Sequence, residues 1–168
     1  ERTIDKIIFE KTSSLLNSKI IVSKQTNNQI LKKIKKTLNY NKSKKIFFND
    51  LFSYTLAENN FFYYEDEYGS LKLPFPNLYG DFQLNNVATA IATIRNIDKI
   101  KISAENIKNG ITKIKSIARF QEIKNGKLKN LCKENRLFID GSHNPLGAKA
   151  ITDYLNTLNS NKHIIIGM

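Results

Sequence analysis

The sequence predicts an α/β fold that includes a small antiparallel β element. In residues 137–145 a short apolar run ends in Asp140 and Gly141, and a segment with helical spacing follows Pro145. A strand that ends at a sharp turn before a helix is typical of open α/β sheets, in which ligands bind at the carboxyl ends of the strands. Between residues 52 and 73, short apolar and aromatic runs are separated by turn residues, which favours antiparallel strands.

The first elements are predicted from apolar spacing and capping residues. Residues 4–16 have the spacing of an amphipathic helix, and residues 20–22 are a short apolar run that indicates a buried strand. Asn27 or Asn28 can cap the lysine-rich helix that follows, to about residue 38. Further strands are predicted over residues 46–48, 52–56, 61–65 and 71–73, with a turn at Tyr68-Gly69 and an extended loop at Pro74 and Pro76.

The second half is predicted to alternate helices and strands. A helix over residues 85–95 precedes one over 104–115, which Ser103 caps. Asn125-Gly126 is a favoured two-residue turn, so residues 119–123 and 127–131 are predicted to form a hairpin. Residues 137–166 are predicted as a strand, a helix and a buried strand joined by a right-handed crossover. We expect two domains, residues 1–116 and 117–168.

The composition is that of an ordinary globular protein. Of the 168 residues, 40% are hydrophobic and 25% charged. The single cysteine excludes an intramolecular disulfide and a cysteine-based metal cage, and it favours a reducing compartment. No apolar run reaches the roughly 20 residues of a membrane span. We therefore expect a cytoplasmic protein without a membrane partner. Neither terminus has the sequence pattern of a natural chain end, so we expect the chain to be an internal piece of a longer protein.

The net charge of +12 raises the alternative of a basic nucleic-acid-binding module. The densest lysine cluster, residues 32–36, interleaves with apolar residues at helical spacing, which indicates a solvated helix face. The densest aromatic run, residues 61–64, is followed by Glu65, Asp66 and Glu67. Acidic neighbours disfavour contact with phosphates, so we expect no nucleic-acid partner.

Four segments in register resemble the folylpolyglutamate synthase/dihydrofolate synthase family of the Mur ligase superfamily. They are T-I-D-K-I-I-F-E-K (residues 3–11), G-D-F-Q-L-N-N-V-A-T-A-I (80–91), I-A-R-F-Q (117–121) and I-D-G-S-H-N-P (139–145). The resemblance implies the C-terminal part of a Mur-ligase-type central ATPase domain, followed by the start of a Rossmann-like C-terminal domain. It implies a reaction in which ATP activates a carboxylate as an acyl phosphate and L-glutamate forms an amide with it.

The substrate implied is dihydropteroate, the glutamate tail of tetrahydrofolate, or both. The alternative is a peptidoglycan-precursor Mur ligase, which has the same kind of ATP site. The D-G-x-H-N-P pattern and the E-K pair favour the folate branch. ATP and Mg²⁺ are the implied cofactors, and a monomer with small-molecule partners is expected. No Gly-rich phosphate loop of the G-x-x-x-x-G-K-[ST] form occurs in the sequence. The chain alone is therefore expected to be inactive.

The resemblance assigns roles to five residues. Lys11 aligns with a lysine that is carbamylated in the family and then helps to place Mg²⁺, which prefers oxygen ligands; an ordinary surface lysine is the alternative. Asn86 aligns with an asparagine that reads adenine, although a helix cap is the alternative. Arg119 and Asp140 align with residues that contact ATP, and His143 is expected near the transferred phosphate. Two departures from the family pattern are Phe82, which replaces a histidine, and residues 12–14, which replace Ala-Gly-Ile.

Overall fold

The computed structural model describes residues 3–15, 18–80 and 82–167, and these form two compact units. Unit 1 comprises Glu1–Pro76 and Leu84–Lys113, and unit 2 comprises Asn77–Gln83 and Ile114–Met168. The predicted domain division at residue 116 stays a prediction. Among the described residues, no helix combines the length and the apolar character that a membrane crossing would need.

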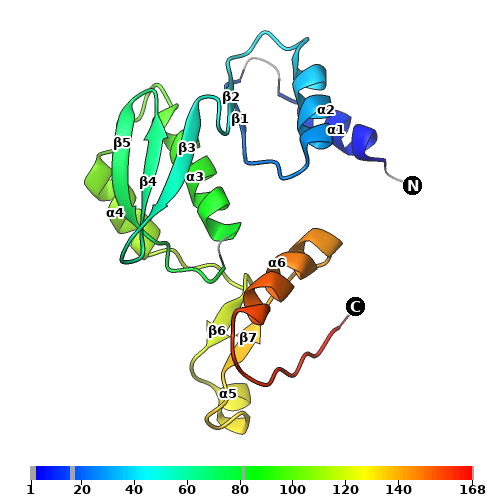
Figure 1. The fold of residues 1–168 in the computed structure, drawn as a ribbon, viewed down its shortest axis with the longest axis vertical. Helices are drawn as coiled ribbons and strands as arrows, with labels where there is room; N and C mark the ends of the chain where they lie inside the picture. The colour runs from blue at the N-terminus through cyan, green and yellow to red at the C-terminus, as the bar shows by residue number, and fades with distance from the viewer. Residues whose placement is uncertain (1–2, 16–17, 81, 168) are drawn as a thin grey trace. The chain divides into compact units, whose positions relative to one another are not determined.

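Unit 1 begins with two helices and a short parallel sheet (Figure 1). Helix α1 (Ile4–Thr12) packs on α2 (Asn28–Leu38), and strand β1 (Ile20–Val22) pairs in parallel with β2 (Lys45–Phe47). The Asn27 side chain accepts hydrogen bonds from two backbone N–H groups of the first turn of α2, which confirms the predicted cap. Helix α1 ends at Thr12, whereas the predicted end at about residue 16 lies outside the described residues.

The lysine cluster of α2 lies on the exposed face of the helix, as predicted. Lys33 Nζ lies 2.8 Å from Asp5 Oδ2 of α1, and Lys35 Nζ lies 2.7 Å from Asp50 Oδ2. The opposite face packs on the small core of β1 and β2, in which Leu38 is buried. The lysine cluster therefore forms a solvated helix face, and the ammonium groups of Lys33 and Lys35 are each paired with a carboxylate.

The predicted antiparallel element is confirmed. Strands β3 (Phe52–Ala57), β4 (Phe61–Asp66) and β5 (Gly69–Pro74) form a three-stranded sheet in sequence order. Phe62, Tyr64 and Leu73 are buried, whereas Tyr63 between them is exposed, because successive side chains of a strand point to opposite faces.

Helices α3 (Phe82–Arg95) and α4 (Ala104–Thr112) follow the sheet in the chain and belong mostly to unit 1. Figure 1 shows both helices alongside β3, β4 and β5. The Tyr54 hydroxyl of β3 donates to Asn85 Oδ1 of α3 at 3.0 Å, and Ser103 caps α4 as predicted. Helix α3 begins three residues before the predicted residue 85.

Unit 2 corrects the predicted hairpin. Strand β6 (Gln121–Ile123) pairs antiparallel with β7 (Leu137–Ile139), and residues 127–131 form the helix α5 (Lys127–Leu131). Gly126 has a φ of 103° and precedes that helix instead of closing a two-residue turn. The hairpin prediction was wrong because β6 finds its partner in the apolar run around Phe138, which packs on Phe120.

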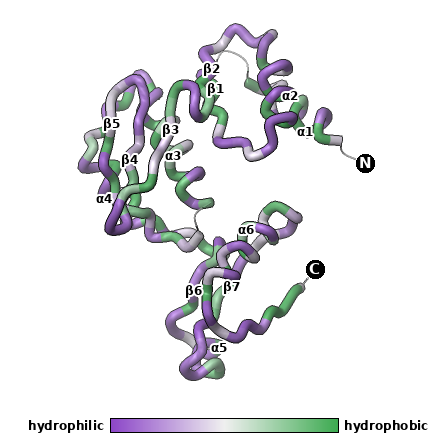
Figure 2. The backbone as a smooth tube through the Cα atoms, in the orientation of Figure 1, coloured by the Kyte–Doolittle hydropathy of each residue, from purple (hydrophilic) through white to green (hydrophobic). Residues whose placement is uncertain are grey.

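The final predicted strand is also absent from the described residues. Helix α6 (Pro145–Asn156) follows β7, but residues 161–167 have no regular structure, and Ile165 is 99% exposed. Figure 2 shows this apolar run as the green segment next to the C-terminus. The predicted crossover fails because no described strand pairs with this run, and a strand without a partner leaves its backbone groups unpaired.

Candidate functional site

Two of the four motif segments are joined directly by hydrogen bonds in unit 2. Asp140 Oδ2 accepts from the backbone N–H of Phe120 at 2.5 Å, and Gly141 N donates to the carbonyl of Ala118 at 2.8 Å. These bonds place the turn after β7 against the segment that carries Arg119. The structure therefore brings Arg119 and Asp140 together although they are distant in the sequence.

The backbone around Arg119 is strained. Ala118 has a φ of 52° and Phe120 a φ of 51°, so both neighbours of Arg119 adopt the left-handed conformation that favours glycine. Such residues cost about 1–3 kcal/mol each and persist only where the surroundings hold them. Phe120 is held by its ring, which is 4% exposed and stacks on Phe138 with centroids 4.7 Å apart. The Arg119 side chain between them is exposed.

The start of α6 lies on the same turn. Asn144 Oδ1 accepts from Gly147 N at 2.9 Å, and Pro145 occupies the first turn, so Asn144 is the helix cap. His143 is exposed, and its Nδ1 lies 3.1 Å from the carbonyl of Gly141. Helix N-termini favour anions, because their first N–H groups have no partner within the helix. Unit 2 thus gathers Arg119, Asp140 and His143 near a helix N-terminus.

The other two predicted site residues lie in unit 1. Lys11 is exposed in the last turn of α1, and Asn86 is exposed in α3. Since α3 begins at Phe82, Asn86 lies within the helix and does not cap it. Asp81 of the same motif lies outside the described residues.

A metal site made by this chain alone is not found among residues 3–15, 18–80 and 82–167. No group of three or more His, Cys, Asp and Glu side chains gathers there. Lys11 would offer one oxygen ligand if it were carbamylated, and Mg²⁺ needs several. The described residues therefore fit at most a part of a Mg²⁺ site.

A polar network without a signal in the sequence supports the Arg119 segment. Glu122 accepts from Arg136 Nε at 2.8 Å and from the Tyr79 hydroxyl at 2.6 Å. Tyr79 packs edge-on against Phe138, with ring centroids 5.6 Å apart. The Arg136 guanidinium and the Tyr79 hydroxyl lower the pKa of Glu122 to about 2. Tyr79 and Glu122 are 43 positions apart, so no local pattern signals the network.

The lowered pKa of Glu122 predicts a loss of stability in acid. Because the folded state holds this carboxyl at a pKa of about 2 and its ordinary value is 4.5, the unfolded state binds the proton first as the pH falls. The stabilisation is complete above pH ~5 and disappears towards pH ~2, and it amounts to about 1–2 kcal/mol after solvent screening. Urea unfolding of unit 2 at several pH values measures it.

The matched variants for this titration are Glu122→Gln and Glu134→Gln. Glu122→Gln should be less stable than the wild type at pH 7 and should lose less on acidification. Glu134 is an exposed carboxyl of the same unit, and its variant should follow the wild type. Equal pH dependence in the wild type and Glu122→Gln would contradict the role of the network.

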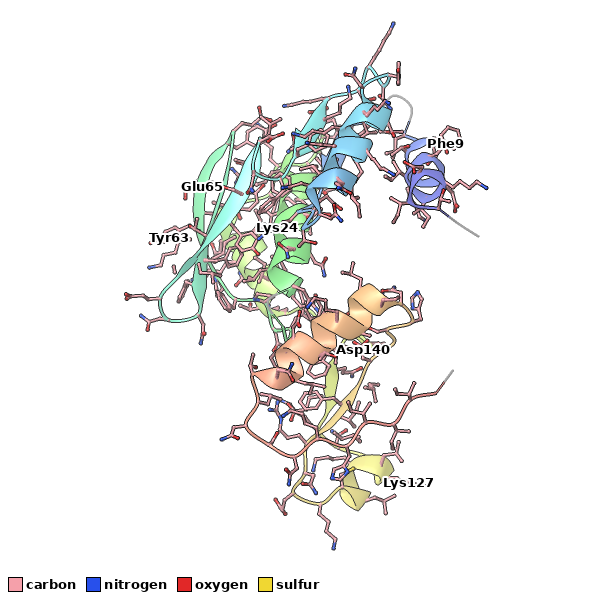
Figure 3. The ribbon with its side chains drawn as sticks, turned by 45° about the vertical axis from the view of Figure 1, so that its right-hand side comes forward. Phe9, Lys24, Tyr63, Glu65, Lys127 and Asp140 are labelled. Atoms are coloured by element: carbon pink, nitrogen blue, oxygen red, sulfur yellow. The ribbon has the colours of Figure 1, made fainter. Side chains whose placement is uncertain are left out.

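A groove in unit 1 contains none of the predicted site residues. It lies between α1 and α2, has a volume of about 660 Å³ and is lined by residues that include Phe9, Lys36 and Tyr40. Phe9, labelled in Figure 3, is 68% exposed and Tyr40 is 87% exposed.

Comparison with known proteins places the fold. No family model and no curated protein sequence matches the chain. Solved structures do match. E. coli FolC in complex with DHPP and ADP is 22% identical with a TM-score of 0.75, over 94% of this chain and 34% of that one.

Two further solved structures match this chain. Folylpolyglutamate synthetase from Lactobacillus casei is 23% identical with a TM-score of 0.70, over 94% of this chain and 40% of that one. Folylpolyglutamate synthase from Thermotoga maritima is 22% identical with a TM-score of 0.70, over 93% of this chain and 36% of that one. The chain thus spans between 34% and 40% of the length of these three structures. The predicted α/β fold class is confirmed, and these 168 residues have the fold of a part of folylpolyglutamate synthase.

Proposed function

We propose that the chain carries part of the ATP site of a ligase that joins L-glutamate to a folate-type carboxylate. The observation that carries the proposal is that the motif residue Asp140 accepts a hydrogen bond from the backbone N–H of Phe120, next to Arg119, within a fold shared with FolC and folylpolyglutamate synthase structures. One of those structures is described as a complex with ADP and DHPP. The folate branch is favoured over a peptidoglycan-precursor Mur ligase because the matched structures are folate enzymes.

In this proposal Arg119 neutralises phosphate charge. The guanidinium is always charged and its planar fork suits phosphate oxygens, and the α6 N-terminus adds the positive end of the helix dipole, which favours anions. His143, on the same turn, would approach the transferred phosphate. ATP transfers its terminal phosphoryl group to the substrate carboxylate, which gives an acyl phosphate and ADP. The glutamate amine then attacks the acyl carbon, so that the amide forms and phosphate leaves. Phosphoryl transfer depends on positioning and charge neutralisation.

In unit 1, Asn86 would read the adenine ring, because an amide offers both a donor and an acceptor to a purine edge. Lys11, once carbamylated, would add one oxygen ligand for Mg²⁺. We further propose dihydropteroate, the folate tail or both as acceptor substrate, a cytoplasmic monomer, and no nucleic-acid or membrane partner. The chain supplies only part of the matched fold, so we propose that it is not a catalyst by itself.

The test is ATP binding by the 168-residue chain. Titration with Mg²⁺-ATP, followed by calorimetry or by amide NMR shifts, should show weak binding that Arg119→Ala lowers at least about tenfold, the worth of a hydrogen bond to a charged group. Arg119→Lys should recover part of the loss, because charge is kept and the planar fork is not. Lys149→Ala, which removes an exposed cation of α6, is the control and should bind like the wild type.

No ATP binding by the wild-type chain, or equal binding by Arg119→Ala, would contradict the proposal. The same samples should release no ADP when dihydropteroate and glutamate are added. Turnover by the chain alone would overturn the statement that it is an incomplete catalyst.

A further inference from the structure

We infer that Glu122 is a positioning residue for Arg119: it fixes the strand that follows the arginine, so that the guanidinium is held in place for a phosphate. The inference rests on the proposed function, in which Arg119 binds the phosphates of ATP. Glu122 is the central residue of β6 and lies three positions after Arg119 in the chain.

Glu122 joins the flanks of three of the four motif segments. It directly follows the third segment, which holds the arginine. Its two partners flank the others, because Tyr79 lies just before the second segment and Arg136 three residues before the fourth. All three side chains belong to unit 2. One carboxylate therefore ties together three stretches of this unit that are far apart in the sequence.

The contacts of Glu122 are directional and largely shielded from solvent. Arg136 donates from Nε to Oε1 at 2.8 Å and from Nη2 to Oε2 at 3.1 Å, and the Tyr79 hydroxyl donates to Oε2 at 2.6 Å. The Glu122 side chain is only 18% exposed, so this two-point pair is less screened by solvent than a pair on the surface. The donors, Arg136 first, lower the pKa of Glu122 to about 2, and the carboxylate is therefore ionised throughout the neutral range.

The network reaches Arg119 through the ring of Phe120, the next residue in the chain. Glu122 lies opposite Phe138 in the register of β6 and β7, and the Phe138 ring stacks on that of Phe120 with centroids 4.7 Å apart. The Arg136 guanidinium lies over the same Phe138 ring, 4.7 Å from its centroid. Phe120 has a φ of 51°, and a left-handed residue of this kind persists only where its surroundings hold it. The ion pair and the stacked rings supply that support.

The backbone on both sides of the arginine is bonded to the turn after β7. Phe120 N donates to Asp140 Oδ2 at 2.5 Å, and the Ala118 carbonyl accepts from Gly141 N at 2.8 Å. Asp140, labelled in Figure 3, also accepts from Ser142 N at 2.6 Å. Since β6 and β7 are only three residues long, their ladder is short, and the ion pair adds a second link between them. A backbone that is already fixed loses little entropy when the guanidinium engages a phosphate.

A double-mutant cycle on the 168-residue chain tests the inference, with Mg²⁺-ATP as the ligand. Glu122→Ala should weaken binding about fivefold, and the double variant with Arg119→Ala should bind no more weakly than Arg119→Ala alone, because residues that act through one another are not additive. Glu122→Gln keeps the shape and one acceptor oxygen, and Arg136→Lys keeps the charge without the planar fork. Both should bind ATP more tightly than Glu122→Ala and more weakly than the wild type. Asp153→Ala breaks an exposed pair of the same unit and is the control, which should bind like the wild type.

Hydrogen exchange without a ligand separates positioning from a general loss of stability. In Glu122→Ala the amides of Phe120 and Gly141, which bond the two segments, should exchange at least about tenfold faster than in the wild type. The amides of α6 in the same unit should speed up less, and those of β4 in unit 1 should not change. Equal acceleration of α6 would show that the carboxylate supports unit 2 as a whole, and it would overturn the inference.

Additive losses in the cycle would overturn the inference too, since Glu122 would then act on binding independently of Arg119. Binding by Glu122→Ala equal to that of the wild type, with binding lowered in Arg119→Ala, would overturn the inference and leave the proposed function standing. Absence of ATP binding by the wild-type chain would overturn the proposed function and the inference with it. Where circular dichroism shows Glu122→Ala to be unfolded, Glu122→Gln takes its place in the cycle under the same criteria.

Discussion

Replacement of Asp66 by alanine is expected to lower the free energy of unfolding of unit 1 by about 3–5 kcal/mol, the cost of breaking a buried ion pair. Asp66 is bound by Arg95 through two bonds, from Nε at 2.8 Å and from Nη2 at 2.9 Å, and its side chain is 3% exposed. It also accepts from the Tyr64 hydroxyl at 3.0 Å. Burial and the nearby Asp66 raise the pKa of Tyr64 far above its usual value, so this hydroxyl stays protonated and donates.

Removal of the carboxylate leaves Arg95, whose side chain is only 12% exposed, as an unpaired charge between α3 and the sheet. Urea unfolding followed by circular dichroism measures the loss. Asp66→Asn keeps the shape and should retain part of the stability through its remaining oxygen. Glu67→Ala, which removes an exposed pair with Lys44, is the control and should leave the midpoint almost unchanged. A midpoint for Asp66→Ala close to that of Glu67→Ala would show that the pair does not support unit 1.

Truncation of Phe62 to alanine is expected to cost about 3–5 kcal/mol, because it deletes a ring from the centre of the core of unit 1. Phe62 is 0% exposed, and its ring lies 6.2 Å from that of Tyr54 and 6.3 Å from that of Phe75. The measurement is the unfolding midpoint in urea, with the slope of the transition checked for unchanged compactness.

Phe61→Ala is the matched control, because the two residues are neighbours with the same side chain. Phe61 lies on the other face of β4 and is only half-buried, so its loss should cost about 1 kcal/mol. A shift of one residue in the pairing of β4 would exchange the two faces. A larger loss in Phe61→Ala than in Phe62→Ala would therefore refute the register in which Phe62 pairs with Leu56 and Leu73.

The predictions from sequence held where the signal is local. Asn27 and Ser103 cap α2 and α4 as their positions before helical runs indicated, because a cap depends only on the next few backbone N–H groups. The strands β3, β4 and β5 were also found, since adjacent strands joined by short turns need no distant partner. Predictions failed at residues 127–131 and 164–166, where the outcome depends on which distant segment offers an edge.

The same distinction between local signals and distant contacts applies to the candidate site. Sequence motifs singled out Arg119 and Asp140, but nothing in either motif shows that the carboxylate binds the backbone beside the arginine. The network of Tyr79, Glu122 and Arg136 gave no sequence signal at all. Such contacts arise only when β6 and β7 pair and bring their flanking segments together.

The sequence by itself determined the α/β class, most helix boundaries to within a few residues, and the motifs that carry the likeness to folylpolyglutamate synthase. These follow from spacing, capping and residue identity, which act over a few positions of the chain. Only the tertiary structure decided the partner of β6, the left-handed backbone around Arg119 and the two bonds of Asp140. The reason is physical: strand pairing and buried polar contacts join distant residues, and their free energy depends on which surfaces meet when the chain folds.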